Sequence, residues 1–315
     1  MDIRQLRYFI AISESGSFSR AAEQVRIAQP ALSQHVQAME AAFGVQLLQR
    51  NPRGVALTEA GLRLLDRARA IDSQFSNLRD FVRGDGVPSG EVRFGMPGTI
   101  SEQLGVLLIE AGRQLYPNVR IRISEAMSGF VLDWLLKGVV DLAMLYNTAD
   151  EKSLKLHHAL TEEIRLFAVP DMISFPSGNA VTLAAILDLP LILPSPSHGL
   201  RDLIDAAAHK ISKRVDVAIE IDSYRQIKEL VARGTGFGLL PATAIRQEMQ
   251  SGTFKSWSIT QPSLMRRIYL GHLADAPLSI ASRAIGQLSW RILKELVQSG
   301  GWTATWEENE DLRLC

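Results

Sequence analysis

The segment "QPALSQHVQAMEAAFG", residues 29–44, carries hydroxyl and amide side chains that a helix would place on one face. The positions on this polar face are Pro30, Ser33, Gln34 and Gln37. The opposite face is an apolar stripe of Leu32, Val36 and Met39. Hydroxyl and amide groups both donate and accept hydrogen bonds, which suits them to the edges of DNA bases. We expect this face to read DNA; the alternative is an amphipathic helix whose polar face only contacts water.

An upstream helix and a short turn must hold that face outward. The segment "SRAAEQV" places Ala21, Ala22 and Val25 on one side, with Ser19 as the expected N-cap. Because alanine side chains are small, two helices can approach closely across the turn "RIAQ". The pattern predicts a helix-turn-helix, in which the second helix enters the major groove.

A turn-rich segment, "LLQRNPRGVALTEAG", follows directly. It predicts two short strands joined by a turn at residues 51–54, with Arg50 and Arg53 near the tip. Arginine makes planar, forked contacts with phosphates and also enters narrow grooves. Residues 1–57 are therefore predicted to form an all-α winged helix-turn-helix domain. Their six arginines and four acidic residues give a net charge of +2 (six minus four), against +0 for the whole chain.

Residues 6–61, from "LRYFIAISESG" to "ALTEAG", resemble the N-terminal domain of LysR-type transcriptional regulators. The later pieces "VRFGMPGTI", "GVVDLAML", "LPLILPSPSHGLRDLID" and "VARGTGFGLLP" are similar to the effector domain of the same family, so the resemblance covers about 1–297. It implies that the bases are contacted by Gln29, Pro30, Ser33 and Gln34. Members often carry arginine where this chain has Gln34, which implies that a guanine contact is absent or replaced here.

Residues 58–86 predict one long helix that opens with Thr58 as N-cap and Glu59 in the first turn. Apolar residues recur along it at every third or fourth position. The resemblance implies that this linker helix dimerises the chain through antiparallel coiled-coil contact. The expected seam residues are Leu62, Leu65, Phe75 and Leu78. The family's dimers offer two winged helices to a partly palindromic site, and many members are homotetramers that bend the DNA.

After a Gly/Pro/Ser-rich linker at 84–91, short apolar strands alternate with helical stretches, which predicts an α/β fold. The resemblance implies a two-lobed effector domain of the periplasmic-binding-protein type. Lobe I would comprise residues 90–163 plus 268–297, and lobe II residues 164–267. The strands "IRLFAVP" and "RRIYLGHL" would cross between the lobes as a hinge. We expect residues 298–315, which are acidic and aperiodic, to form a C-terminal tail on the surface.

Candidate ligand-binding residues follow three predicted strands, because strand ends and helix N-termini meet at one edge of an α/β sheet. They are Gly98, Thr99, Ile100, Ser128, Ser195, Ser197 and His198. Their N–H and hydroxyl groups would suit a small carboxylate or sulfonate, and the alternative is that the hydroxyl groups only cap helices. Relatives often have an Arg-Pro pair at Pro196-Ser197, so the family's anion specificity does not carry over directly.

The sequence shows no catalytic or metal-binding constellation, so we expect neither an enzyme nor a cofactor. The only cysteine, Cys315, leaves no pair for a disulfide or a cysteine metal cluster. The run "GTGFG", residues 234–238, follows a helix and precedes a strand, which is the reverse of a dinucleotide-binding turn. A solute-binding protein is the alternative function, and the attached DNA-reading segment argues against it.

The opening "MDIRQLRYFI" places an acid and a base before any apolar run, unlike a signal peptide. No apolar stretch approaches the ~20 residues of a membrane span. We therefore expect a cytoplasmic protein with no membrane contact. The expected partners are promoter DNA, a small-molecule effector and further copies of the chain, and RNA polymerase stays open as another. The sequence does not decide the promoter, the direction of regulation, the effector, or dimer against tetramer.

Overall fold

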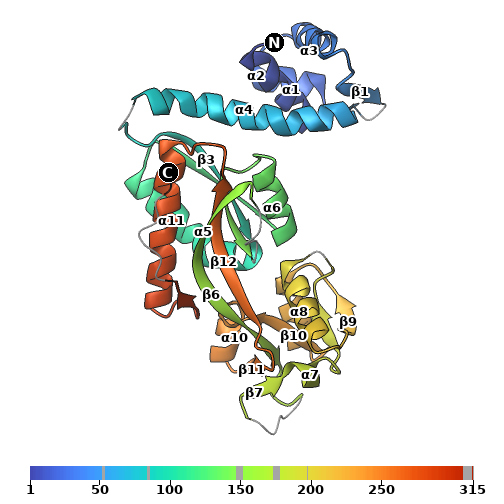
Figure 1. Ribbon diagram of the computed structural model, residues 1–315, viewed down its shortest axis with the longest axis vertical. Helices are drawn as coiled ribbons and strands as arrows, with labels where there is room; N and C mark the ends of the chain where they lie inside the picture. The colour runs from blue at the N-terminus through green and yellow to red at the C-terminus, as the bar shows by residue number, and fades with distance from the viewer. Residues whose placement is uncertain are drawn as a thin grey trace.

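The computed structural model describes residues 1–51, 54–83, 86–146, 152–172, 178–196, 198–307 and 314. They form an N-terminal helical domain with a small wing, one long helix, and an α/β domain whose two lobes are stacked end to end (Figure 1). This architecture confirms the predicted fold class.

The N-terminal domain consists of three helices and a two-stranded wing: α1 (Ile3–Ser15), α2 (Phe18–Val25), α3 (Gln29–Phe43), β1 (Leu48–Asn51) and β2 (Gly54–Leu57). The Asp2 side chain starts α1 by accepting the Gln5 N–H at 2.9 Å in a capping box. The N-cap of α2 is Ser17, whose hydroxyl accepts the Arg20 N–H. The prediction of Ser19 as the cap is wrong, because α2 already begins at Phe18.

The helices pack around one apolar core. The predicted stripe of Leu32, Val36 and Met39 is buried in it, as are Ala21 and Ala22 of α2. Burial of this stripe fixes the rotation of α3 about its axis, so its opposite face must point outward.

The long helix α4 (Glu59–Arg83) begins as predicted, with the Thr58 hydroxyl accepting the Gly61 N–H at 3.0 Å. Leu65 of this helix is only 8% exposed and packs in the N-terminal core together with Ala68. Its predicted place in a dimer seam is therefore wrong, because the side chain is already buried within its own chain.

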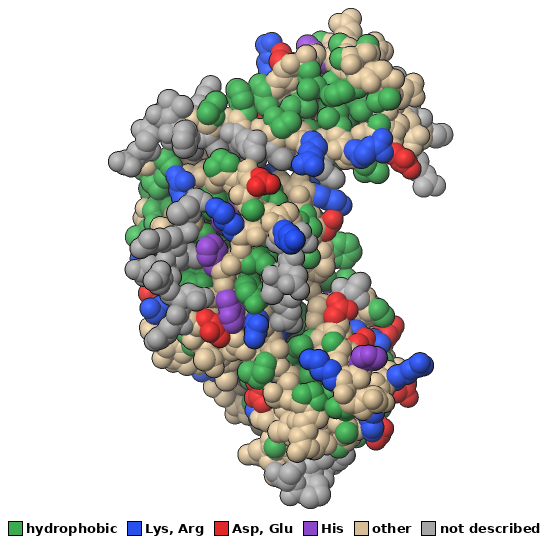
Figure 2. Space-filling model, in the orientation of Figure 1, with side chains coloured by type: hydrophobic (Ala, Val, Ile, Leu, Met, Phe, Trp, Pro, Cys, Tyr) green, Lys and Arg blue, Asp and Glu red, His purple; other side chains and the backbone are tan. Residues whose placement is uncertain are grey.

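The other predicted seam residues lie on the outer side of α4. Leu62 is 54% exposed, Phe75 44% and Leu78 53%, and Ile71 between them is exposed as well. Figure 2 shows hydrophobic side chains gathered over α4 and the adjoining face of the N-terminal domain. The role of these residues in a dimer stays a prediction.

One sheet runs through both lobes in the order β4-β3-β5-β12-β6-β10-β8-β9, with β7, β11 and β13 attached beside it. The strands are β3 (Gly90–Pro97), β4 (Val119–Ala126), β5 (Leu142–Tyr146), β6 (Leu154–Ala168), β7 (Ala180–Thr182), β8 (Leu191–Leu193), β9 (Val217–Glu220), β10 (Phe237–Pro241), β11 (Lys255–Thr260), β12 (Met265–Leu273) and β13 (Thr305–Trp306). The helices are α5 (Gly98–Leu115), α6 (Ser128–Leu136), α7 (Leu183–Ile186), α8 (Gly199–Lys210), α9 (Tyr224–Ala232), the 3-10 turn η1 (Ala242–Ile245), α10 (Arg246–Gln250) and α11 (Ile280–Gln298).

Two long strands, β6 and β12, run between the lobes (Figure 1). β12 pairs with β5 in one lobe, and the far end of β6 pairs with β10 and β11 in the other. Each lobe has its own core, one drawn from residues 164–264 and one from residues 92–160, 268–293, Trp302 and Leu314. The predicted lobe boundaries, at residues 163 and 268, fall inside these two strands.

The C-terminal segment departs from its predicted place on the surface. Trp302 is 2% exposed in the lobe I core, and its Nε1 donates to Glu162 Oε2 at 2.9 Å. The carbonyls of Gly300 and Gly301 accept hydrogen bonds from Arg246 of lobe II. The few apolar residues of this segment have no regular spacing, so no periodicity in the sequence indicates that they are buried.

Among the described helices, none combines the length and apolar character that crossing a membrane requires.

Candidate functional site

Helix α3 presents its polar residues away from the core. Gln29, Pro30, Gln34 and Gln37 are exposed and Ser33 is half-buried. The predicted polar face is therefore a surface of the domain. Uncharged groups that donate and accept, carried on a protruding helix, match the geometry of a major groove.

The wing beside α3 is fixed by hydrogen bonds to its backbone. The Glu40 carboxylate of α3 accepts the N–H groups of Leu47 and Leu48, at 2.8 and 3.1 Å. On the other strand, Gly54 has a φ of 130°, and a Cβ there would lie 2.5 Å from the Gly16 carbonyl oxygen. Only glycine tolerates both conditions, so Gly54 holds the wing against the end of α1.

The two arginines predicted at the wing tip are only partly placed. Arg50 belongs to β1 and pairs in register with Val55, but its side chain is not among those described. Arg53 lies outside the described residues. Their contacts with DNA stay predictions.

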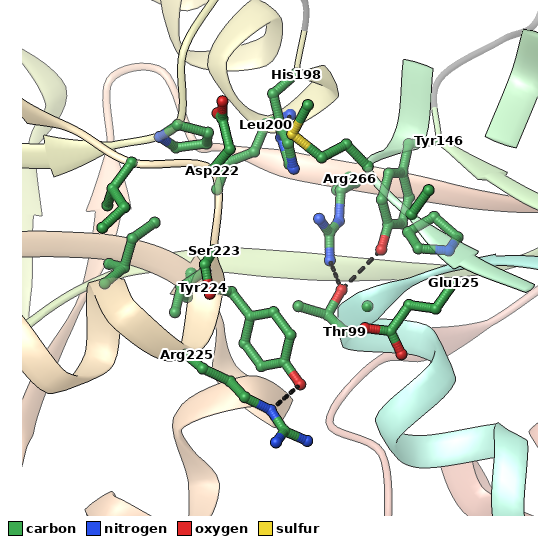
Figure 3. Close-up of a pocket in the computed structure, with 18 residues that line it drawn as sticks. Thr99, Glu125, Tyr146, His198, Leu200, Asp222, Ser223, Tyr224, Arg225 and Arg266 are labelled. Carbon is green, nitrogen blue, oxygen red and sulfur yellow. Dashed lines mark hydrogen bonds between the residues drawn. The ribbon is translucent and has the colours of Figure 1, made fainter. Parts of the chain in front are cut away.

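A cavity of about 310 Å³ lies between the two lobes of the α/β domain, where Figure 2 shows the surface hollowed. Thr99, Glu125 and Tyr146 approach it from lobe I, and Asp222 and Tyr224 approach it from lobe II (Figure 3). Arg266 reaches the same space from the crossing strand β12. The cavity therefore contacts both lobes and the hinge between them.

Four helices begin at this cavity. On the lobe II side, the His198 side chain caps α8 and the Ser223 side chain caps α9. On the lobe I side, α5 and α6 begin without any side-chain cap. An uncapped N-terminus leaves N–H donors unpaired and presents the positive end of the helix dipole. The lobe I side is thus the better side for an anionic group.

Arg266 is the central charged group of the cavity, although it is only 2% exposed. Its Nε donates to Glu162 Oε1 at 2.9 Å, and its Nη2 donates to the same oxygen and to Thr99 Oγ1. The guanidinium lies over the Tyr146 ring, 3.9 Å from the ring centroid. A buried ion pair of this kind persists because each charge is compensated and hydrogen-bonded.

The titratable groups of the cavity have defined charge states. Burial raises the pKa of Tyr146 to about 12, so its phenol keeps its proton and hydrogen-bonds Thr99 at 2.7 Å. Burial, and then the charge of Arg266, lower the pKa of His198 to about 4, so its imidazole is neutral near pH 7. The backbone N–H and hydroxyl of Ser195 donate to Asp222 and lower its pKa, so this carboxylate is ionised.

The structure brings three of the predicted ligand residues together at the cavity, namely Gly98, Thr99 and His198. Ile100 is fully buried in the lobe I core and does not line it. The side chain of Ile100 points inward because the first turn of α5 packs on the sheet, so this residue offers a ligand only its backbone N–H, and its role stays a prediction.

The predicted serines have structural partners instead. The Ser128 hydroxyl accepts the N–H of Gly199 at 3.0 Å and joins the two lobes, and the Ser195 hydroxyl donates to Asp222. Neither residue lines the cavity in this structure, and the ligand contacts predicted for Ser128 and Ser195 stay predictions. Ser197 lies outside the described residues.

Sequence reasoning missed Tyr146, Asp222, Tyr224 and Arg266. Asp222 and Tyr224 follow the strand β9, so the rule that points to strand ends would have found them too. Arg266 sits within a strand, and only the tertiary fold shows that Glu162 lies beside it.

Two family models match the chain. Residues 3–62 match the bacterial regulatory helix-turn-helix protein of the lysR family, and residues 85–291 match the LysR substrate binding domain. The nitrogen assimilation regulatory protein nac of Escherichia coli K12 is 32% identical over 301 residues, 94% of this chain and 97% of the relative. The DNA-binding transcriptional dual regulator OxyR of Escherichia coli K12 is 27% identical over 88% of this chain and 91% of its own.

Solved structures show the same fold over nearly the full length. A full-length OxyR variant from Pseudomonas aeruginosa superposes with a TM-score of 0.79 at 21% identity and covers 98% of this chain and 99% of its own. Full-length BenM superposes with a TM-score of 0.56 at 24% identity and covers 98% of this chain and 100% of its own.

The matched models account for both halves of the molecule, the helical domain with its exposed α3 and the α/β domain with its cavity. The relatives are transcriptional regulators, not solute-binding proteins or enzymes. The chain therefore belongs to the LysR family of bacterial transcriptional regulators, with a helix-turn-helix DNA-binding domain and a substrate-binding effector domain.

Proposed function

We propose that this regulator binds a partly palindromic promoter site as a homodimer, with α3 of each chain in a major groove. The observation that carries the proposal is the exposed polar face of α3, which its buried stripe fixes outward. Gln29, Ser33 and Gln34 contact base edges, and the wing arginines contact phosphates or the minor groove. Pro30 and Gln37 complete the contact surface on the same face.

The exposed apolar row on α4 supports a homodimer. Leu62, Phe75 and Leu78 are each more than two-fifths exposed, which is unusual for a helix whose apolar face packs only within its own chain. A second copy offers the same row, so an antiparallel pair of α4 helices buries both rows at once. We further propose that two dimers form a homotetramer across two neighbouring sites and that the protein contacts RNA polymerase. Its proposed location is the cytoplasm.

Phe75→Asp tests the dimer. A charge placed in the seam loses its hydration on association, so we expect this variant to sediment as a monomer while its helices stay folded. Glu59→Gln, at an exposed position at the start of α4, is the matched control and should stay dimeric. A Phe75→Asp protein that sediments like the wild type would place residue 75 outside the seam.

The interlobe cavity is proposed to hold a small metabolite with an anionic group. Arg266, Thr99 and the uncapped start of α5 form the side that favours such a group. Because β6 and β12 are the strands that cross between the lobes, a ligand held by both lobes would change the angle between them. In a dimer, that change alters the spacing of the two reading helices.

Selection from a pool of randomised DNA duplexes tests the proposed function directly. Full-length protein at moderate salt should enrich a two-fold symmetric motif, and the affinity for this motif should exceed that for random DNA by about a thousandfold or more. Enrichment of no motif would contradict the proposal. Binding that falls with salt but ignores sequence would leave only a non-specific DNA-binding protein.

A further inference from the structure

The C-terminal segment, residues 299–306, is anchored in lobe I at two points. The Trp302 side chain is 2% exposed in the lobe I core, and the short strand β13 pairs with β6. Trp306 of this strand packs edge-on against Trp290 of α11, with ring centroids 5.1 Å apart. The match to the substrate-binding domain model ends at residue 291, so this segment is an addition to the part of the fold that the model describes.

The same segment is also bound by lobe II. Arg246 Nη1 donates to the carbonyl of Gly300 at 2.6 Å and to that of Gly301 at 2.8 Å. The Thr243 hydroxyl accepts the N–H of Thr303 at 3.1 Å. Hydrogen bonds from a charged guanidinium are stronger than those between neutral groups. The segment therefore joins the two lobes beside the crossing strands β6 and β12.

A buried carboxylate connects this segment to the interlobe cavity. Glu162 is 1% exposed, and its two oxygens serve different partners. Oε2 accepts from Trp302 Nε1 at 2.9 Å, and Oε1 accepts from Arg266, whose Nη2 also donates to Thr99 in the cavity. Removing one member of such a network leaves a buried partner unsatisfied. A movement of Arg266 is therefore transmitted to Trp302.

The segment and the cavity lie on different sides of the crossing strands. In Figure 1, α10 and the end of α11 lie to the left of β6 and β12, whereas α6 and α8 lie to the right. Met127 and His198, which directly precede α6 and α8, line the cavity. No residue of η1, α10 or the C-terminal segment is among the described residues that line it. When two lobes bend about a pair of strands, contacts on one side separate as those on the other side approach.

We propose that residues 299–306 act as a clasp that holds the two lobes at the angle of this structure and opposes their closure around a ligand. Closure on the cavity side pulls Arg246 and Thr243 away from the clasp. Glu162 links the two events, because the carboxylate that positions Arg266 also holds Trp302. This inference rests on the proposed function in one respect, since the clasp resists the same change in lobe angle.

Spin labels across the mouth of the cavity test the clasp in the full-length protein. The labels are attached at Phe130→Cys on α6 and Ala206→Cys on α8, both exposed positions, and Cys315→Ser removes the only native cysteine. Labelled chains are diluted with unlabelled ones, so that electron–electron resonance measures distances within one chain. We expect Arg246→Ala to broaden the distance distribution and to shift it to shorter distances, because the lobes close more easily.

Two further variants make this measurement decisive. Arg233→Ala removes an exposed lobe II arginine whose partner Glu229 lies one turn away, so this matched control should keep the wild-type distribution. Distances that are unchanged or longer in Arg246→Ala overturn the clasp. If that variant does not fold, Thr243→Val, which removes the acceptor of the Thr303 N–H, is judged by the same criterion.

Hydrogen exchange tests the link between the cavity and the clasp. Arg266→Lys keeps the positive charge but not the two donors that Glu162 accepts, so we expect peptides of residues 299–306 to exchange about tenfold or more faster than in the wild type. Peptides of β4, in the same lobe, should keep their rates. Arg93→Lys, at a lobe I arginine paired with Asp141, is the matched control and should leave the clasp unchanged. Unchanged rates in the clasp, or an equal increase in β4, would overturn the link.

The clasp and the proposed function fail in different ways. Lobe distances that ignore Arg246→Ala remove the clasp, while the protein still selects its DNA motif. Wild-type protein that enriches no DNA motif removes the proposed function, and the lobe distances measured in the same protein do not depend on that result.

Discussion

The polar surface of α3 and the polar lining of the interlobe cavity are built in opposite ways. On α3, the side chains come from one run of nine residues, point outward and stand above an apolar stripe that holds the helix in place. In the cavity, they come from both lobes and the hinge strand, and the central one, Arg266, is held by the buried Glu162, to which Trp302 also donates. The first surface is rigid because of the core beneath it, and the second because of the hydrogen bonds among its own members.

This difference separates stability from binding. A polar side chain on α3 can be removed with little effect on the fold, because its neighbours in the core do not change. A side chain in the cavity network leaves a buried partner unsatisfied when it is removed. Variants on α3 should therefore lose DNA binding, whereas variants in the cavity network should lose stability.

The largest effect is expected at the buried ion pair. Glu162→Gln removes the charge that compensates Arg266, and breaking a buried pair by neutralising one partner costs about 3–5 kcal/mol. We expect the free energy of unfolding of the α/β domain to fall by that amount in urea titrations followed by tryptophan fluorescence.

A double variant serves as the control for this change. Glu162→Gln with Arg266→Met removes both charges, so it should lose less stability than the two single variants together. Single-variant losses below about 1 kcal/mol, or strict additivity, would mean that the pair is not a coupled unit.

The next effect separates two leucines on α4. Leu65→Ala deletes a side chain from the N-terminal core and should lower the stability of that domain by about 2–5 kcal/mol. Leu62→Ala, one turn earlier and 54% exposed, should cost the monomer about 0.5 kcal/mol or less. Denaturation followed by circular dichroism at protein concentrations that favour the monomer measures both. Equal losses would contradict the different placement of the two residues.

These leucines show what the sequence can and cannot predict. Helical spacing correctly indicates an apolar row on α4, but Leu62 and Leu65 fit the same row, and only the tertiary fold decides that Leu65 faces the N-terminal core. On α3 one local period determines both faces, so the exposed residues could be predicted. The cavity depends on contacts across long sequence separations, such as Arg266 with Glu162 and Thr99, which no local pattern encodes.

The imidazole of His198 provides a smaller effect that depends on pH. The pKa of His198 is lowered from 6.5 to about 4 in the fold, so its contribution to stability is complete above pH 6.5 and is lost as the pH falls toward 4. The unfolded chain takes up a proton there that the fold excludes. We expect the wild type to lose about 2–3 kcal/mol more than His198→Asn between pH 7 and pH 4.5.

Asparagine at this position can still cap α8 and does not titrate, so the comparison isolates the imidazole. The measurement is urea unfolding of both proteins at the two pH values. Identical pH profiles would show that His198 is not held neutral by its surroundings.

The smallest effects on stability, with a clear effect on binding, are expected on α3. Ser33→Ala and Gln29→Ala should each weaken binding to the selected DNA motif by about 1–3 kcal/mol, because each removes a hydrogen-bonding group from a base edge. Both should leave the melting temperature and the dimer unchanged, since neither side chain belongs to the core. Gln287→Ala, at an exposed position of α11 far from α3, is the matched control and should bind normally.

Fluorescence anisotropy with the selected duplex and a scrambled one measures the result. The loss of affinity must appear on the selected duplex and be much smaller on the scrambled one. An equal loss of affinity on both duplexes would mean that these residues contact phosphates and not bases. A loss of stability without a loss of specificity would mean that α3, like the cavity, depends on its polar side chains for folding.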